Sequence, residues 1–280
     1  MRLTFKINII ILLLQSTIFA IGTQFLAIPR NTSDLILGYT PIVNIESNNP
    51  IISASYGNWL ADMKISSLNY ERNIFGGRVG LDFRYISLND LELRTERPTD
   101  DPLSYYNSSA LSMDGNYTRQ YKFGLLSTTL RYISLQLYNE SSNGMAVDVS
   151  LSKTLRKNIN VGLAVLNLGY MSDLYHEKPQ LPVRTIIGAS YNFELLQFNH
   201  SFSTVVEKSS LVDGMIIRIS DTMNIGKIQI LLGTQIADNA TSLSGGINLK
   251  LGNYRFGYGV QIGTQALGIP QMLNFSVILP

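Results

Sequence analysis

Apolar and polar residues alternate along most of the chain. Between residues 254 and 262 every even position is aromatic or aliphatic, and every odd position is Arg, Gly or Gln. Further stretches at 78–85, 145–151, 246–251 and 273–279 alternate in the same way. Because successive side chains of a β-strand point to opposite faces, each stretch offers one apolar and one polar face. The pattern predicts an all-β chain.

Turn residues divide this pattern into strands. Gly76-Gly77, Asn143-Gly144 and Gly252-Asn253 are typical of tight connections between antiparallel strands. We predict about 14 strands, near residues 51–56, 62–73, 78–88, 114–126, 128–139, 144–153, 159–168, 181–193, 196–207, 212–220, 225–236, 242–252, 254–263 and 271–280. Residues 89–113 hold Pro98, Pro102 and many charges, so we expect one long loop there, on the extracellular side.

The N-terminal region differs from the rest of the chain. Arg2 and Lys6 precede an apolar run at 9–14, and the small residues Ala20 and Gly22 follow, as in a cleavable signal peptide over residues 1–22. That run is too short to span a bilayer as a helix. Residues 23–43 do not alternate, and we expect them to form a short helical plug, with the barrel proper over 44–280.

A transmembrane antiparallel β-barrel of about 14 strands with a short N-terminal helical plug explains these features together. Closing the sheet removes the unpaired edges that a bilayer does not tolerate. A soluble β-sandwich or a lipocalin-like barrel would alternate equally well. A barrel of 14 strands, however, is too wide for inward apolar side chains to fill, which favours an apolar outside and a polar lumen.

The composition of the chain limits the classes of partner and chemistry that we expect. Hydrophobic residues make up 45% of the chain and its mean hydropathy is +0.10, as expected when only alternate residues meet lipid. A formal charge of +2 gives no reason to expect a nucleic-acid partner. The chain has no Cys, which excludes disulfides and thiol chemistry.

Strand parity assigns the two faces of the wall. Phe83, Phe256 and Phe275 should face lipid with their aliphatic neighbours. Arg131 shares parity with Ile133 and Leu135, so we expect it near a membrane edge or beside a β-bulge. We predict a polar network in the lumen made by Arg78, Asp82, Arg84, Arg184 and Arg255. Such a network could line a solute path or a docking surface, or it could serve only as the polar lining that any barrel of this kind needs.

The sequence gives little support for catalysis. His176 and His200 are the only histidines, and adjacent residues of a strand such as His200 and Ser201 point to opposite faces. The pair Asp100-Asp101 lacks the spaced oxygen ligands of a Ca²⁺ loop. We therefore expect no enzyme activity, no cofactor and no resident metal.

Several short segments follow one another along the chain: Gln24-Phe25-Leu26-Ala27-Ile28 with Arg30, Leu37-Gly38-Tyr39, Trp59-Leu60-Ala61-Asp62, Val165-Leu166-Asn167-Leu168-Gly169, and Leu181-Pro182-Val183-Arg184 with Gly188. In this order they resemble the PorV/PorQ family, a branch of the FadL-like outer-membrane barrels. They follow one another over nearly the whole mature chain. The resemblance implies a 14-stranded barrel with an N-terminal plug.

The resemblance also implies a function. PorV-like proteins act in type IX secretion, where they receive secreted cargo at the outer membrane and pass it on for surface attachment. The first hypothesis is therefore a barrel of the outer membrane whose partners are the lipid bilayer, secreted cargo and components of the secretion machinery. The alternative is a FadL-like transporter of hydrophobic small molecules, which predicts an apolar pocket beneath the outer loops and a lateral gap where a strand kinks. A structural barrel without transport is a third reading.

Overall fold

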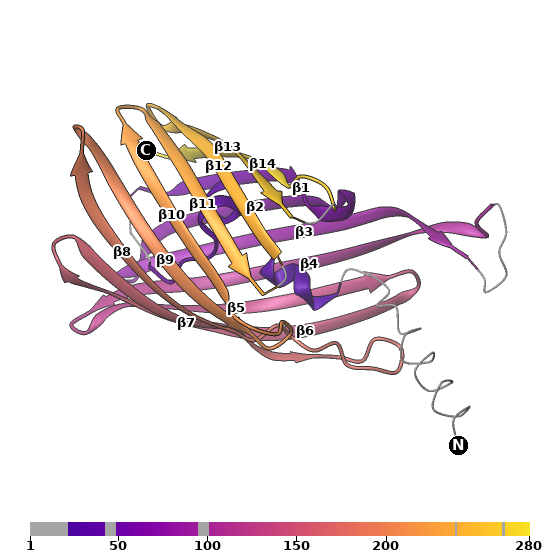
Figure 1. The fold of residues 1–280 in the computed structure, drawn as a ribbon. Helices are drawn as coiled ribbons and strands as arrows, with labels where there is room; N and C mark the ends of the chain where they lie inside the picture. Colours follow the sequence, from indigo (N-terminus) through magenta and orange to yellow (C-terminus); the bar gives the residue numbers. More distant parts are fainter. Residues whose placement is uncertain (1–21, 43–48, 95–100, 239, 265–266) are drawn as a thin grey trace, which may run out of the picture.

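Fourteen antiparallel strands form one closed barrel, as predicted (Figure 1). The computed structural model describes residues 22–42, 49–94, 101–238, 240–264 and 267–280. The strands are β1 (Ile51–Asn58), β2 (Lys64–Ile74), β3 (Gly77–Leu93), β4 (Ser104–Tyr121), β5 (Gly124–Leu137), β6 (Glu140–Arg156), β7 (Ile159–Met171), β8 (Arg184–Leu195), β9 (Phe198–Ser209), β10 (Ile216–Ile225), β11 (Ile228–Ala237), β12 (Ala240–Leu251), β13 (Tyr254–Gly263) and β14 (Gln271–Ile278). Each strand pairs with its neighbours in sequence, and β1 pairs with β14 from Ile51↔Ile278 to Asn58↔Gln271, which closes the wall.

The two ends of the barrel carry different connections. At one end, here called the short-turn end, two residues join β2 to β3, β4 to β5, β6 to β7, β8 to β9, β10 to β11 and β12 to β13. The opposite, long-loop end also has two-residue connections after β5 and β11, but its other connections are longer, such as 172–183 between β7 and β8. Outer-membrane barrels place short turns in the periplasm and long loops outside the cell, and we orient the chain accordingly.

The long loop expected at 89–113 is mostly strand, which corrects that prediction. β3 continues to Leu93 and β4 begins at Ser104, and their pairing resumes at Leu91 after a register shift that follows Leu88. The resulting hairpin projects well beyond the rest of the barrel (Figure 1). A hairpin outside the bilayer meets water on both faces, so its charged residues do not oppose strand formation.

The wall is apolar outside and polar inside. Phe83, Phe256 and Phe275 are 39%, 46% and 39% exposed on the outer surface, whereas Arg84 and Arg184 are buried in the lumen. This confirms the predicted orientation of the wall and the transmembrane barrel fold. Among the described residues no helix has the length and apolar character needed to cross a membrane.

The expectation for Arg131 was wrong. Arg131, Ile133 and Leu135 are all buried on the lumen side of β5, and β5 pairs with both neighbours without a bulge. Apolar residues face inward here because the N-terminal segment gives them an apolar partner inside the barrel.

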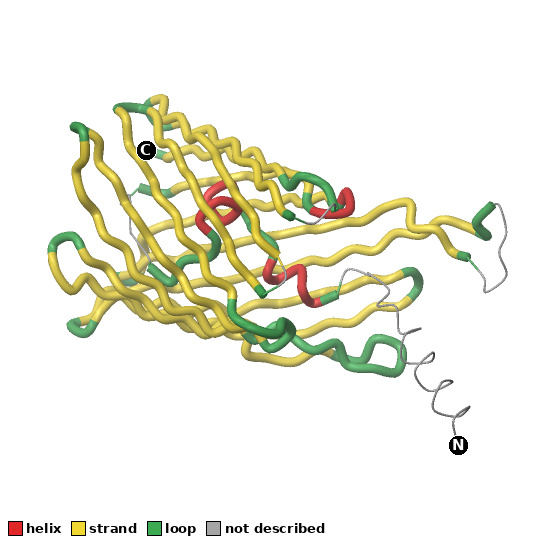
Figure 2. Tube along the Cα trace, viewed as in Figure 1, coloured by secondary structure: helices red, strands yellow, loops and turns green. Residues whose placement is uncertain are grey.

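The N-terminal segment lies within the barrel (Figure 2). It consists of the 3₁₀ helix η1 (Thr23–Ala27) and the α-helix α2 (Thr32–Leu37), and a further 3₁₀ turn, η2 (Leu60–Asp62), follows β1. Phe25, Leu26 and Leu35 are buried among apolar residues of the wall. We call residues 23–42 the plug. The predicted signal peptide, residues 1–22, lies almost entirely outside the described residues.

Candidate functional site

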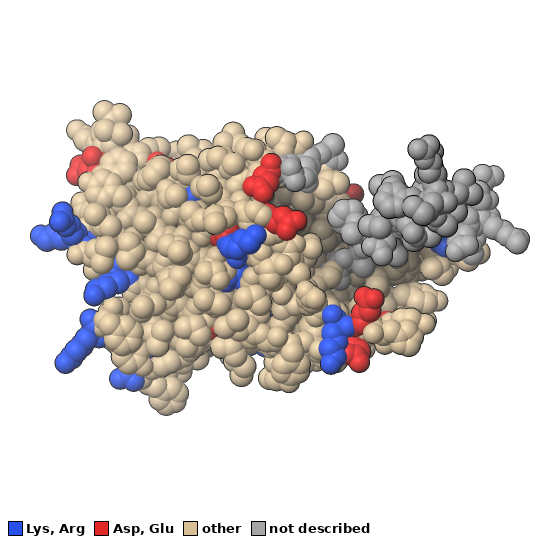
Figure 3. Space-filling model, turned by 60° about the horizontal axis from the view of Figure 1, so that its bottom comes forward, with Lys and Arg blue, Asp and Glu red and all other residues tan. Residues whose placement is uncertain are grey.

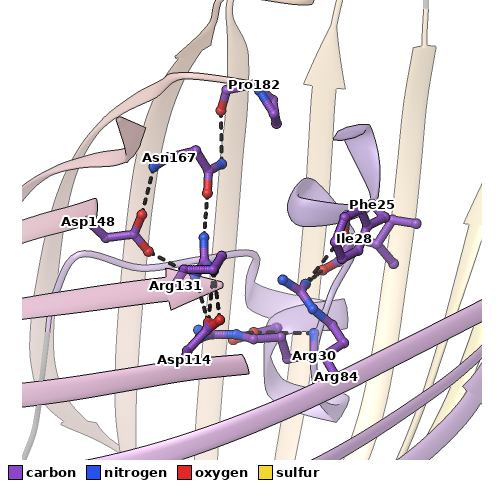
Figure 4. A network of polar contacts seen from close by, with 10 residues as sticks. Phe25, Ile28, Arg30, Arg84, Asp114, Arg131, Asp148, Asn167 and Pro182 are labelled. Atoms are coloured by element: carbon purple, nitrogen blue, oxygen red, sulfur yellow. Dashed lines mark hydrogen bonds and ion pairs between the residues drawn. The ribbon is translucent and has the colours of Figure 1, made fainter. Parts of the chain in front are cut away.

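Three wall side chains hold the backbone of the plug. Arg84 Nη1 on β3 donates to the Ile28 carbonyl at 3.0 Å and to the Phe25 carbonyl at 3.4 Å (Figure 4). Ser67 Oγ on β2 donates to the Arg30 carbonyl at 2.7 Å, and Ser244 Oγ on β12 donates to the Ile36 carbonyl at 3.0 Å. The wall thus supplies donors to backbone carbonyls of the plug that lie inside the lumen.

Local sequence shapes helix α2. Asn31 caps its N-terminus by accepting a hydrogen bond from the Asp34 amide at 2.9 Å, and Gly38 ends it with a φ of 73°. Arg30 Nε donates to Asp34 Oδ2 at 3.0 Å. The Asp34 carboxylate raises the pKa of the Arg30 guanidinium, so Arg30 stays charged beside the helix.

Glycines in the wall give α2 its seat. A methyl group on Gly233 of β11 would lie 2.1 Å from the Ile36 carbonyl oxygen. On Gly246 of β12 it would lie 2.3 Å from Ile36 Cδ1. A side chain at Gly233 would push the helix backbone off the wall, whereas at Gly246 it would meet the movable end of the Ile36 side chain and the Tyr258 carbonyl of β13.

A buried network links four neighbouring strands, β4 to β7, on the lumen side of the wall (Figure 4). Arg131 of β5 pairs with Asp114 of β4 at 2.7 Å and with Asp148 of β6 at 2.9 Å. It also donates to the Asn167 side chain of β7. The Asp148 carboxylate in turn accepts a hydrogen bond from the backbone N–H of Asn167 at 2.6 Å. One cation is thus shared by two carboxylates, and hydrogen bonds with Asn167 satisfy further polar atoms of the group.

A second ionic group lies on β8–β10. The Glu207 carboxylate accepts from Arg184 at 2.8 Å and from Arg218 at 2.6 Å. Arg184 also lies over the Tyr39 ring, 5.9 Å from its centroid, and Arg218 contacts Gly38 of the plug. Two cations share one carboxylate, so this part of the lumen has a net positive charge.

The plug separates two cavities of different character. The outer chamber, about 310 Å³, opens towards the long-loop end, and the inner vestibule, about 430 Å³, opens towards the short-turn end. Apolar residues of the outer chamber include Leu26, Ile28, Leu35, Trp59, Leu60, Leu166, Val212, Ile216 and Pro270. The inner vestibule is lined mainly by hydroxyl, amide and charged side chains such as Ser53, Ser55, Asn69, Thr129, Asn248 and Asn274. The first favours a partly apolar solute and the second favours water.

Hydrogen-bonded pairing between two wall strands ends beside the outer chamber. β7 pairs with β8 only up to Leu166↔Arg184, although β7 continues to Met171 alongside β6. The β6–β7 register also shifts after Val147, and Asn167 has a φ of 61°. Asn167 Nδ2 bridges the interruption by donating to the Pro182 carbonyl at 2.9 Å. A single side-chain hydrogen bond therefore spans the place where strand pairing is missing.

Three of the five predicted network residues contact different partners. Arg84 holds the plug, Arg184 pairs with Glu207, and Arg78 pairs with Glu71 at 2.6 Å. Asp82 and Arg255 line the inner vestibule. The sequence predicted only that these side chains face the lumen. Their partners in the structure are residues that the predicted set did not include.

The predicted set omitted Glu71 and Glu207, which pair with Arg78 and Arg184, and it omitted Arg218 and the group of Asp114, Arg131 and Asn167. The order Val-Leu-Asn-Leu-Gly at 165–169 was the available signal for Asn167, because Asn tolerates the positive φ of a bulge. Parity alone could not reveal Glu207, since its inward neighbour Val205 is apolar.

The residues considered for catalysis and metal binding lie apart from these cavities. His200 shares the outward face of β9 with the exposed Phe202, and its Nδ1 contacts Asp221 Oδ2 at 2.9 Å. His176 contacts the Tyr175 ring in the segment between β7 and β8. In the part of the chain that the structure describes, no group of three His, Cys, Asp or Glu is arranged to hold a metal. Asp100 lies outside the described residues.

Known structures share this architecture. The fold is that of outer-membrane β-barrels. The chain is similar to the CymD monoaromatic hydrocarbon channel, with a TM-score of 0.69 and 11% identity over 90% of this chain and 98% of that one. It is also similar to a deletion mutant of the TodX monoaromatic hydrocarbon channel, with a TM-score of 0.55 and 10% identity over 90% of this chain and 99% of that one. No protein-family model and no curated protein matches the chain.

Proposed function

We propose that this protein is a non-enzymatic outer-membrane channel for small, mainly apolar molecules. The main support for the proposal is the outer chamber, which lies beneath the long loops and combines apolar side chains with charged ones. Small-molecule sites typically combine an apolar lining with a few placed polar groups. An apolar pocket in this place is also what the FadL-like alternative predicts.

The chamber limits the size of the solute. A cavity of about 150 Å³ accommodates benzene, so about 310 Å³ is sufficient for one aromatic ring with short substituents. The cation-rich group of Arg184, Glu207 and Arg218 lines the same chamber. It would orient a solute that carries one polar substituent.

The interrupted ladder supplies an exit. Leu166, Asn167 and Arg184 line the outer chamber at the point where β7 and β8 stop pairing. A solute that displaces the Asn167–Pro182 hydrogen bond would pass sideways into the apolar part of the bilayer. The plug blocks the straight path, because it lies between the outer chamber and the inner vestibule.

The comparisons support a channel rather than a secretion factor. Two structures that share the fold are described as monoaromatic hydrocarbon channels. The role in type IX secretion, with cargo proteins as partners, rests on the PorV/PorQ resemblance and stays a prediction. Unchanged display of surface proteins in a deletion strain would count against it.

Trp59 offers a direct test of solute binding. It is the only Trp in the chain and it lines the outer chamber. We expect a monoaromatic hydrocarbon to change Trp59 fluorescence saturably in detergent-solubilised protein, whereas a sugar of similar size does not. The variant Trp59→Phe should abolish the signal.

Two matched variants locate the site. Leu166→Phe enlarges a buried residue that lines the chamber, and we expect it to weaken binding by about tenfold, which corresponds to roughly 1.4 kcal/mol. Leu168→Phe makes the same change two residues away on the outer surface and should bind like the wild type. The proposal would be wrong if both variants bound the hydrocarbon with equal affinity, or if only the sugar changed the Trp59 fluorescence.

A further inference from the structure

Cations gather on the outside of the short-turn end. Arg72, Arg119 and Lys153 are exposed, and their strand partners Val79, Leu126 and Val161 show that they share the outward face of the wall. We call the following set the basic rim: Arg72, Arg119, Lys122, Lys153, Arg156 and Lys157. Figure 3 shows basic side chains at this end of the barrel. The set occupies one continuous arc, from β2 to β7.

Carboxylates do not neutralise this arc. No member of the basic rim forms an ion pair with a residue that the structure describes. Glu71 precedes Arg72, but its carboxylate bonds Arg78 on the lumen side. The outer surface of this arc is therefore positively charged.

Large apolar side chains lie between the cations. Phe75, Phe123 and Leu155 are 83%, 53% and 58% exposed in or beside the short turns. The Arg119 guanidinium also lies 5.7 Å from the centroid of the Tyr121 ring. Apolar groups this exposed are unfavourable in water, whereas rings and cations together are typical of the boundary between lipid tails and headgroups. The mixture of rings and cations in this arc therefore suits the headgroup layer of a membrane.

The opposite end has the opposite charge. Exposed carboxylates there include Asp62, Asp90, Asp173, Glu177, Asp213 and Asp238. Two of its cations are already paired, Arg94 with Glu92 at 2.7 Å and Lys178 with Asp173 at 3.8 Å. An anionic membrane surface is thus attracted to the short-turn end only.

We propose that the basic rim binds the phosphate groups of anionic phospholipids in the leaflet at the short-turn end, which is the periplasmic leaflet. Guanidinium and ammonium groups on the outward face would donate to phosphate oxygens, while Phe75, Phe123 and Leu155 contact the upper part of the acyl chains. This inference goes beyond solute transport, and it requires only that the barrel lies in a membrane.

Competition between two lipids tests the proposal. Purified protein is incubated with equal amounts of phosphatidylglycerol and phosphatidylcholine, and the retained lipids are counted by native mass spectrometry. We expect the wild type to retain phosphatidylglycerol with a preference of about tenfold or more, since several cations act together. The triple variant Arg72→Gln, Arg119→Gln, Lys153→Gln should retain the two lipids about equally.

A charge-matched control uses the other end of the barrel. Lys64→Gln, Arg94→Gln, Lys178→Gln removes the same net charge at the long-loop end and should keep the preference. Phe75→Ser with Phe123→Ser should reduce retention of both lipids without changing their ratio. Heat-modifiable migration on gels verifies that each variant folds.

Three results would overturn the proposal. The wild type could bind both lipids equally, the rim variant could keep its preference, or the rim variant could lose both lipids to the same extent. The last result would indicate general damage to the surface rather than recognition of charge.

Discussion

Single residues in the lumen each connect structures that are distant in sequence. Arg84 links β3 to the plug, and Glu207 joins Arg184 and Arg218 from the two neighbouring strands. Arg131 has the largest set of partners, two carboxylates and one amide. Burying charged groups with so little access to water costs free energy, which their partners offset. We expect the lumen to be sensitive to changes that remove one member of a pair.

Arg131→Met tests this expectation. The variant leaves Asp114 and Asp148 buried without their cation, and we expect it to lower the free energy of unfolding by about 3–5 kcal/mol. Urea titration of the folded barrel in lipid vesicles measures the change. Replacing both carboxylates as well, in Arg131→Met, Asp114→Asn, Asp148→Asn, should recover much of the loss. A cost below about 1 kcal/mol for the single variant would show that water reaches these carboxylates.

The plug is the element that gives the barrel its two cavities. A helix of six residues is too short to be stable alone, so its position depends on the wall. The wall supplies hydroxyl donors, the Arg84 guanidinium and a glycine seat. Contacts with α2 come from β10 to β14, while η1 packs among apolar residues of the outer half. A side chain at the glycine seat should therefore displace α2 and connect the two cavities.

Gly233→Ala fills the seat. Its methyl group would lie 2.1 Å from the Ile36 carbonyl oxygen, so we expect α2 to move off β11 and the ion conductance in planar bilayers to rise severalfold. Gly245→Ala on the adjacent strand is the control, because its nearest neighbour would be Leu232 at an ordinary 3.7 Å. Equal conductance of the two variants would mean that the plug does not depend on this contact.

At the scale of the whole molecule, closure is the main requirement. β1 and β14 pair along all of β1, and the wall has no edge strand. An open edge within a bilayer would leave backbone donors and acceptors without partners, which costs several kcal/mol for each group. The plug makes no contribution to this ladder. Closure and plugging should thus be separable by deletion.

Two deletions make the comparison. Without residues 271–280, β1 and β13 both lose a partner, and we expect no heat-resistant folded band after refolding into detergent. Without residues 23–42 the wall keeps every strand pair, and we expect a folded, less stable and more conductive barrel. A folded band from the first deletion, or none from the second, would contradict this division of roles.

The sequence by itself determined the strand number, the closed barrel and the direction of most side chains. These follow from local alternation and two-residue turns, which repeat along the chain and need no distant contact to be recognised. Only the tertiary structure decided where Arg131, Ile133 and Leu135 point, how the β3–β4 hairpin extends, and which partners the predicted lumen residues take. Those features depend on the plug and on strands far apart in sequence, and the period of a single strand contains no information about either.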